Sequence, residues 1–208
     1  MERGGCPTNE LALAFRSHVL RLAQDPNFVH RRWYVEYHLE IVEKIAMELT
    51  NIYPEADRSF ILVLVWLHDY GKLIDRDHEH ELTLTEGRRA LIEIGFPSTY
   101  CDRAVEYISL LDNSRRVDLT KAPIEVRIVS SADGCAHFAG PFFQIWLWEN
   151  PERPLHELMK ENRRKAEKDW ARKIVLPEAR AAFEGRYRIV CEQNGDLPGN
   201  YIATGTDG

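Results

Sequence analysis

One uninterrupted apolar segment constrains the fold of this chain more than any other feature. Residues 60–67 read FILVLVWL and contain no charged side chain, so the segment must be buried on all sides. Its β-branched residues would suit a buried strand, whereas its position between helical patterns favours a central buried helix. The segment leads directly into His68, Asp69 and Tyr70, and we expect the helix to end near Gly71.

The sequence on both sides of this segment also has helical periodicity. Apolar residues recur at helical spacing in residues 9–23, and in residues 31–50 His38 shares one face with Ile41, Ile45 and Leu49. No pair of strands is indicated, so the predicted fold class is all-α, in the form of a compact helical bundle. Further helices are expected at 82–94, 100–111, 123–134 and 155–190, with the aromatic stretch 138–148 packed against the core.

Composition narrows the classes of function. The chain has 208 residues, 44% of them hydrophobic and 29% charged, with a formal net charge of −6. An acidic chain is not expected to bind nucleic acid or an anionic membrane through long-range attraction. The N-terminal sequence MERGGCPTNE lacks the apolar region of a signal peptide, and no run of 18 apolar residues occurs. The four cysteines form no metal or redox motif, so we expect reduced thiols and a cytoplasmic protein.

Four side chains carry the chemistry that this sequence suggests. His38 lies on the apolar face of its helix, His68 and Asp69 follow the most apolar segment, and Asp133 lies one turn past Val129. Imidazoles and carboxylates directed into a core cost several kcal/mol unless they are paired or bind a metal. A mixed set of nitrogen and oxygen ligands suits one divalent cation, whether Mn, Co, Fe, Ni or Zn, and less readily Mg.

Each of these residues also has a simpler interpretation. A histidine on an apolar face is more often a hydrogen-bonded core residue than a ligand, and Asp133 can cap the turn at Gly134. The order of the residues favours the metal: a histidine, an apolar helix ending in His-Asp, and a distant aspartate on another apolar face.

The segments YHLEIVEKIA, VLVWLHDYGK and RIVSSADG resemble the HD-domain superfamily of metal-dependent phosphohydrolases. The resemblance covers about residues 25–140 and implies that His38, His68, Asp69 and Asp133 ligate a metal in a compact helical bundle. It predicts a single HD-type domain, with a C-terminal helical extension at 141–191 and a flexible tail at 192–208.

The chain departs from the two-metal members of that superfamily. Those members have further histidines after the His-Asp pair, and His78 or His80 could supply one of them. The next would be expected near the end of YISLLD, where this chain has Leu110, Leu111 and Asp112. We therefore expect a mononuclear site, which also disfavours the di-iron oxygenase branch of the superfamily.

Several polar residues outside the ligand set could act on a phosphate. Lys72 is one turn past His68 and could offset charge on phosphoryl oxygens, although a solvated lysine at a helix end is equally compatible. His78 and His80 could contact the phosphate or donate a proton to the leaving oxygen, or lie in a polar surface loop. By the resemblance, Asp69 could also help to deprotonate the attacking water.

Other basic residues are assigned to the surface. His30, Arg31 and Arg32 precede the first ligand helix and could recognise phosphate, but a solvated basic turn is favoured. The basic residues of 163–173 alternate with acidic ones, which is typical of an exposed helix with salt bridges. His18, His137 and His156 are given no role.

Two functional hypotheses follow. The first is an enzyme that hydrolyses a small phosphorylated metabolite, with a nucleotide as the leading candidate. The second is a nonenzymatic regulatory module of the same fold that binds a nucleotide or a protein. The complete ligand set favours the enzyme. The aromatic residues of 142–148 are expected to pack in the core, although they could also form a homodimer contact.

Overall fold

The computed structural model describes residues 7–112 and 117–198, and within these ranges the regular elements are all helical. The all-α class predicted from the sequence is confirmed. The α-helices are α1 (Pro7–Leu22), α2 (Glu40–Thr50), α3 (Arg58–Leu67), α4 (Glu79–Leu82), α5 (Arg88–Ile94), α6 (Ser98–Asp112), α7 (Ile124–Ala139), α8 (Phe142–Glu149), α9 (Leu155–Arg172) and α10 (Pro177–Gln193). Short turns complete the described part: π-helical η1 (Val35–Leu39) and η4 (Thr83–Gly87), and 3₁₀-helical η2 (Tyr70–Leu73), η3 (Arg76–His78) and η5 (Leu119–Lys121).

The central apolar segment is a buried helix, as the sequence predicted. The side chain of Asp57 accepts a hydrogen bond from the backbone N–H of Phe60 at 2.9 Å and so caps the N-terminus of α3. All residues from Phe60 to Leu67 are buried. Each large apolar side chain buried in this way contributes about 1.5–3 kcal/mol, so α3 holds His68 and Asp69 at the end of a rigid rod.

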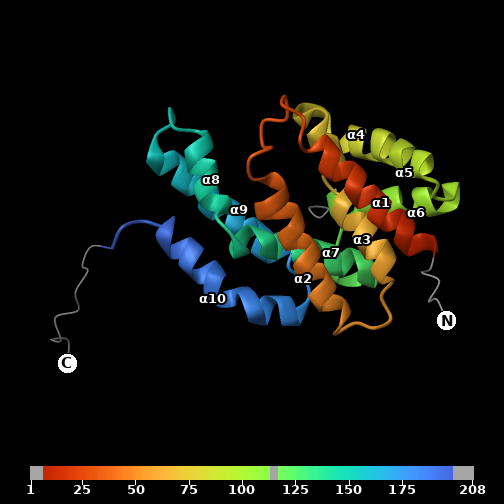
Figure 1. Ribbon diagram of the computed structural model, residues 1–208. Helices are drawn as coiled ribbons and strands as arrows, with labels where there is room; N and C mark the ends of the chain where they lie inside the picture. The colour runs from red at the N-terminus through yellow and green to blue at the C-terminus, as the bar shows by residue number, and fades with distance from the viewer. Residues whose placement is uncertain (1–6, 113–116, 199–208) are drawn as a thin grey trace.

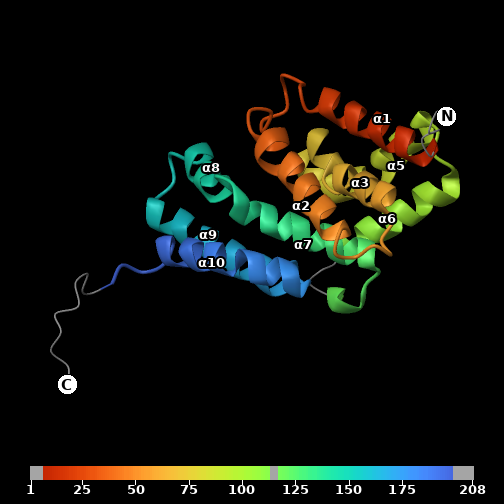
Figure 2. The same cartoon turned by 60° about the horizontal axis from the view of Figure 1, so that its bottom comes forward.

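Helix α7 is the other central element. It contacts α2 and α3 on one side and α9 and α10 on the other, as the two views of the ribbon show (Figures 1 and 2). One connected hydrophobic core extends from Ala12 in α1 to Ala179 in α10. In the described ranges no helix has both the length and the apolar character needed to span a bilayer.

The helix predicted at 31–50 has an irregular first part. A turn of π-helix, η1, precedes α2 and carries His38. A π-turn inserts an extra residue into the helical ladder and is frequent at functional sites. Residues 82–94 are similarly interrupted by the π-turn η4 between α4 and α5.

The prediction of one long helix at 155–190 was wrong, because the chain breaks into α9 and α10. Pro177 occupies the first turn of α10, where its missing N–H costs nothing. The hydroxyl oxygen of Ser131 in α7 accepts hydrogen bonds at 3.1 Å from the backbone N–H groups of Val175 and Leu176. Ile174 and Leu176 are fully buried beside this turn. The bend therefore folds α10 back along α9 and attaches both helices to α7.

Gly71 allows the chain to turn sharply after the His-Asp pair. A Cβ atom at this position would lie 2.0 Å from the carbonyl oxygen of Glu79. The backbone N–H of Gly71 donates to the Thr83 hydroxyl at 2.8 Å, and that hydroxyl donates to the Glu79 carbonyl at 2.8 Å. This close packing of η2 against α4 leaves no room for a side chain.

We predict that Gly71→Ala lowers the free energy of unfolding by about 2–3 kcal/mol, since the added carbon meets backbone rather than a movable side chain. Gly185→Ala is the matched control: its Cβ would meet nothing within 4 Å in the middle of α10, and we expect stabilisation of about 0.5–1 kcal/mol. Urea denaturation measures both. Equal stability of Gly71→Ala and the unsubstituted chain would contradict the packing described.

Candidate metal centre

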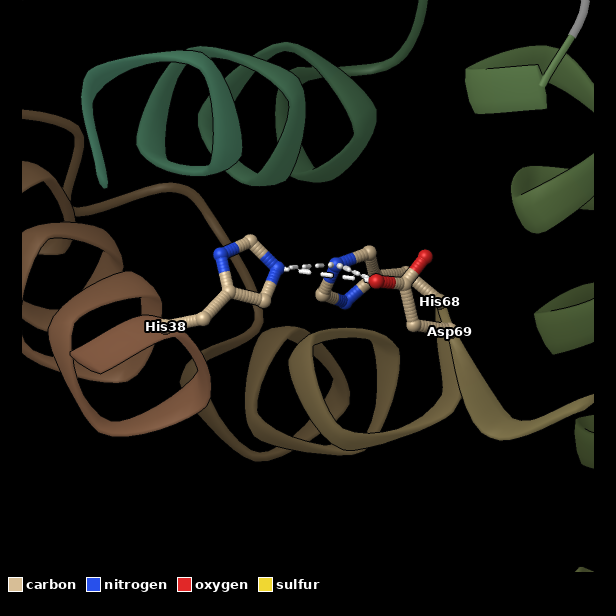
Figure 3. A group of neighbouring side chains, drawn as sticks. All are labelled: His38, His68 and Asp69. Atoms are coloured by element: carbon tan, nitrogen blue, oxygen red, sulfur yellow. Dashed lines mark hydrogen bonds and ion pairs between the residues drawn. The ribbon is translucent and has the colours of Figure 1, made fainter. Parts of the chain in front are cut away.

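The four residues predicted as metal ligands meet at one place. Nε2 of His38 lies 3.3 Å from Nε2 of His68, 3.5 Å from Oδ2 of Asp69 and 3.7 Å from Oδ1 of Asp133. Nε2 of His68 lies 3.6 Å from the Asp69 oxygen and 4.0 Å from the Asp133 oxygen. Figure 3 shows His38 pointing across from η1 toward His68 and Asp69 at the end of α3. Three helical elements thus deliver the set that the sequence indicated.

These ligand atoms are removed from solvent. The exposed fraction is 2% for His38, 8% for His68 and 7% for Asp133. The ring of His68 is oriented by a hydrogen bond of 2.7 Å from Nδ1 to the carbonyl oxygen of Val65, which leaves the lone pair of Nε2 facing the centre. An imidazole held in this way, with its other nitrogen bonded to a carbonyl, is the usual state of a histidine that binds a metal.

The carboxylates of the site are ionised. Burial opposes the charge of Asp69, but Lys72 and the imidazole of His68 hold its pKa well below the usual range. Burial likewise opposes the charge of Asp133, and Lys173 and His137 outweigh it, so this pKa is also well below normal. Burial lowers the pKa of His38, which favours the neutral ring. Ionised carboxylates beside neutral imidazoles are the protonation states that a divalent cation requires.

His137 belongs to the same cluster, although the sequence analysis gave it no role. It lies one turn past Asp133 on α7, and its Nε2 is 3.5 Å from Oδ1 of that residue. Its ring stacks on His38, with centroids 5.3 Å apart and planes inclined by 7°. One ligand atom each from His38, Asp133 and His137 lie within 4.8 Å of one another, as do those of His38, His68 and Asp69.

The orientation of His137 is fixed from behind. Its Nδ1 lies 2.8 Å from Oδ2 of Asp169, a fully buried residue of α9. If Nδ1–H donates to this carboxylate, the Nε2 lone pair faces the Asp133 oxygen, and two acceptors confront each other. Burial lowers the pKa of His137 to about 3, so a proton does not bridge them. A cation between the two atoms would remove this mismatch, and the carboxylate–histidine pair is a common support for a metal ligand.

Two lysines from the basic stretch 163–173 enter the site, which corrects its assignment to an exposed helix. The ammonium of Lys173 pairs with Asp133, and that of Lys165 pairs with Asp169. Arg163 is exposed and pairs with Glu167 at 3.0 Å, as expected of a solvated face. Residues 165, 169 and 173 are four apart, so they follow one face along α9. That spacing is the signal in the sequence that the overall charge pattern concealed.

Lys72 lies at the site rather than in solvent. Its ammonium is 2.5 Å from Oδ2 of Asp69, and the hydroxyl of Tyr34 donates to the same oxygen at 2.9 Å. Asp69 therefore has one oxygen fixed by two donors. This arrangement holds the carboxylate in place and keeps a positive charge beside it.

His78 and His80 are not brought into the site. His78 lies on η3 with 64% of its side chain exposed, and its Nδ1 contacts Asp75 at 2.9 Å. The side chain of His80 is 53% exposed and contacts Asp112 at 2.5 Å. The turn after Gly71 directs both rings away from the ligand atoms, so neither lines the cavity around them. His80 acts on the site only through Asp112, which does line it.

The basic turn before η1 is also different from the solvated turn that was expected. Arg31 and Arg32 are exposed, but His30 is 8% exposed and its Nδ1 lies 2.9 Å from Oε1 of Glu149. His30 therefore connects this turn to the end of α8.

A cavity of about 230 Å³ surrounds the ligand atoms. Its wall includes the ammonium-bearing residues Lys72, Lys165 and Lys173 as well as the acidic residues Glu79 and Asp112. Burial raises the pKa of both Glu79 and Asp112. The centre thus combines atoms suited to a cation with ammonium groups suited to an anion.

Comparison with known proteins yields no relative: no family model matches the chain, and searches of the curated proteins and of the solved structures return no match.

We predict that His137→Ala weakens the binding of Co²⁺ or Mn²⁺ to the purified chain. The loss should be at least the roughly 10–100-fold that removal of a supporting residue costs. His156→Ala, which removes an exposed histidine of α9, serves as the control and should leave the affinity unchanged. Competition with a fluorescent chelator measures the affinity. An unaltered affinity in His137→Ala would show that His137 is not a ligand.

Proposed function

We propose that this chain is a metal-dependent phosphohydrolase of the HD-domain type, with a mononuclear centre formed by His38, His68, Asp69 and Asp133 and extended by His137. One observation carries the proposal: imidazole and carboxylate ligand atoms converge in a small cavity whose wall also contains three lysines. A cation and an anionic oxygen group are the pair of ligands that such a wall accommodates together. The resemblance in the three sequence segments points to the same chemistry.

The bound cation would supply Lewis acidity, polarising a phosphoryl oxygen and lowering the pKa of a water molecule. The residues of the chain supply orientation and charge. Asp69 is ionised and held by Tyr34 and Lys72, so it can accept a hydrogen bond from the attacking water in a fixed direction. The ammonium groups of Lys72, Lys165 and Lys173 can offset charge that develops on phosphoryl oxygens.

The nonenzymatic alternative uses the same site for binding alone. Nothing in the ligand set is missing, and the three lysines face the cavity rather than a protein surface, so hydrolysis is the favoured function. The oxygenase alternative requires a second metal. The described part of the chain offers Lys165 and Lys173 next to Asp169 and Asp133, and these ammonium groups occupy the place where a second cation would be repelled.

We predict that His68→Ala and Asp69→Ala each lose bound metal and phosphate release together. A panel of nucleotides and simple phosphate esters, assayed with added Mn²⁺ or Co²⁺, measures the activity, and metal analysis of the purified protein measures occupancy. His78→Ala is the control, since its ring is exposed and outside the cavity. Retention of full activity in variants that bind less metal would overturn the proposed mechanism.

We predict that Lys72→Gln keeps the metal but lowers kcat by about 10²–10³-fold, because one donor aimed at developing charge contributes roughly that much. The exposed Lys121, whose side chain is 84% accessible, provides the control variant Lys121→Gln. Steady-state kinetics and metal affinity together decide the matter. A binding module without activity would instead show unchanged ligand affinity in all variants and no phosphate release in any.

A further inference from the structure

A second cavity adjoins the metal centre and has a different character. Its volume is about 370 Å³, within the range of roughly 300–1,000 Å³ common for small-molecule sites. It shares Trp33, Lys72, Phe142 and Lys165 with the wall of the first cavity. Beyond these, Ile145 and Trp146 add apolar surface from α8. We call this second cavity the aromatic pocket.

Acidic side chains fix the two indole rings of the aromatic pocket. The Nε1–H of Trp33 donates to Oε1 of Glu149 at 2.7 Å, and the same oxygen lies 2.9 Å from Nδ1 of His30. The Nε1–H of Trp146 donates to Oε2 of Glu161 at 3.3 Å. Rings held in this way lose little freedom when a ligand binds, so the pocket is preformed.

Glu161 and Glu149 are also held independently of the ligand. Both oxygens of Glu161 accept hydrogen bonds from Arg153, at 2.9 and 2.6 Å. These carboxylates line the pocket as hydrogen-bond acceptors. They favour hydroxyl and amino groups on an occupant and disfavour a second phosphate near them.

The charges are arranged along the path from one cavity to the other. Lys72 and Lys165 belong to both walls, so positive charge lies between the metal centre and the aromatic pocket. A phosphate ester has its charge at the same relative place, between the phosphorus and the organic group. Base–aromatic stacking and contact with indole rings favour a flat, unsaturated organic group over an aliphatic one.

We propose that the aromatic pocket binds the organic group of the substrate, an aromatic ring system with hydrogen-bond donors such as a nucleoside, while its single phosphate occupies the metal centre. The inference rests on the proposed function and narrows its substrate to nucleoside monophosphates. Glycerol 3-phosphate and similar aliphatic esters would leave the pocket empty. Nucleoside triphosphates would bring further negative charge against Glu149 and Glu161.

The neighbouring tryptophans of α8 provide a matched pair of variants. Trp146 lines the aromatic pocket, whereas Trp148 is 58% exposed and lies outside it. With a panel of four nucleoside monophosphates and glycerol 3-phosphate, we expect the unsubstituted protein to prefer the nucleotides. Trp146→Ala should raise KM for the preferred nucleotide about tenfold or more, with KM for glycerol 3-phosphate unchanged. Trp148→Ala should leave both values unchanged, and Trp146→Phe should recover most of the affinity.

Equal effects of Trp146→Ala and Trp148→Ala, or a preference for glycerol 3-phosphate, would overturn the assignment of the pocket. A second measurement needs no variant: the nucleoside of the preferred nucleotide and inorganic phosphate should bind the metal-loaded protein simultaneously, as measured by calorimetry. If one excludes the other, the two cavities do not form one substrate site.

The failure of the proposed function gives a different result from the failure of this inference. Absence of phosphate release from every ester would refute the hydrolase, and calorimetry with nucleosides would then still test the pocket. Nucleoside binding that is lost in Trp146→Ala but kept in Trp148→Ala would support the pocket without catalysis. Failure of all nucleosides and nucleotides to bind would refute it.

Discussion

The structure depends on the burial of negative charge in its interior. Asp69, Asp133 and Asp169 are all shielded from water by the helices around them, and an isolated carboxylate in such surroundings would be strongly destabilising. Each is stabilised by an ammonium group: Lys72 for the first, Lys173 for the second and Lys165 for the third. These are three pairs contributed by different parts of the chain, and together they define where a small cation and a phosphate could coexist.

The sequence was most informative where burial was continuous. Residues 60–67 had to be interior, and the residues that follow them, His68 and Asp69, are therefore carried into the core with little freedom. His38 and Asp133 were indicated because each shares a face with apolar neighbours, and the structure brings them within 4.0 Å of His68. Short-range periodicity was thus sufficient to find the four central residues.

The remaining site residues could not be found in this way, because their roles depend on packing between distant helices. His137 has the same face as Asp133, but only its contact with Asp169 of α9 shows what the ring is held for. Lys165 and Lys173 occur among charges that are solvated on other faces of the same helix. His78 and His80 were misplaced for the opposite reason: they are close to the metal residues in sequence, yet the turn at Gly71 directs them outward.

The attachment of the turn between α9 and α10 to Ser131 has a consequence for how the centre is tuned. Ser131 lies two residues before Asp133, and it bonds the backbone just two residues after Lys173. The carboxylate and its counter-charge are therefore registered to each other by a backbone clasp rather than by their own ion pair alone. Shifts of the C-terminal hairpin relative to α7 would be transmitted to the electrostatic balance at the cation, so a region remote in sequence from the His-Asp pair sets its working potential.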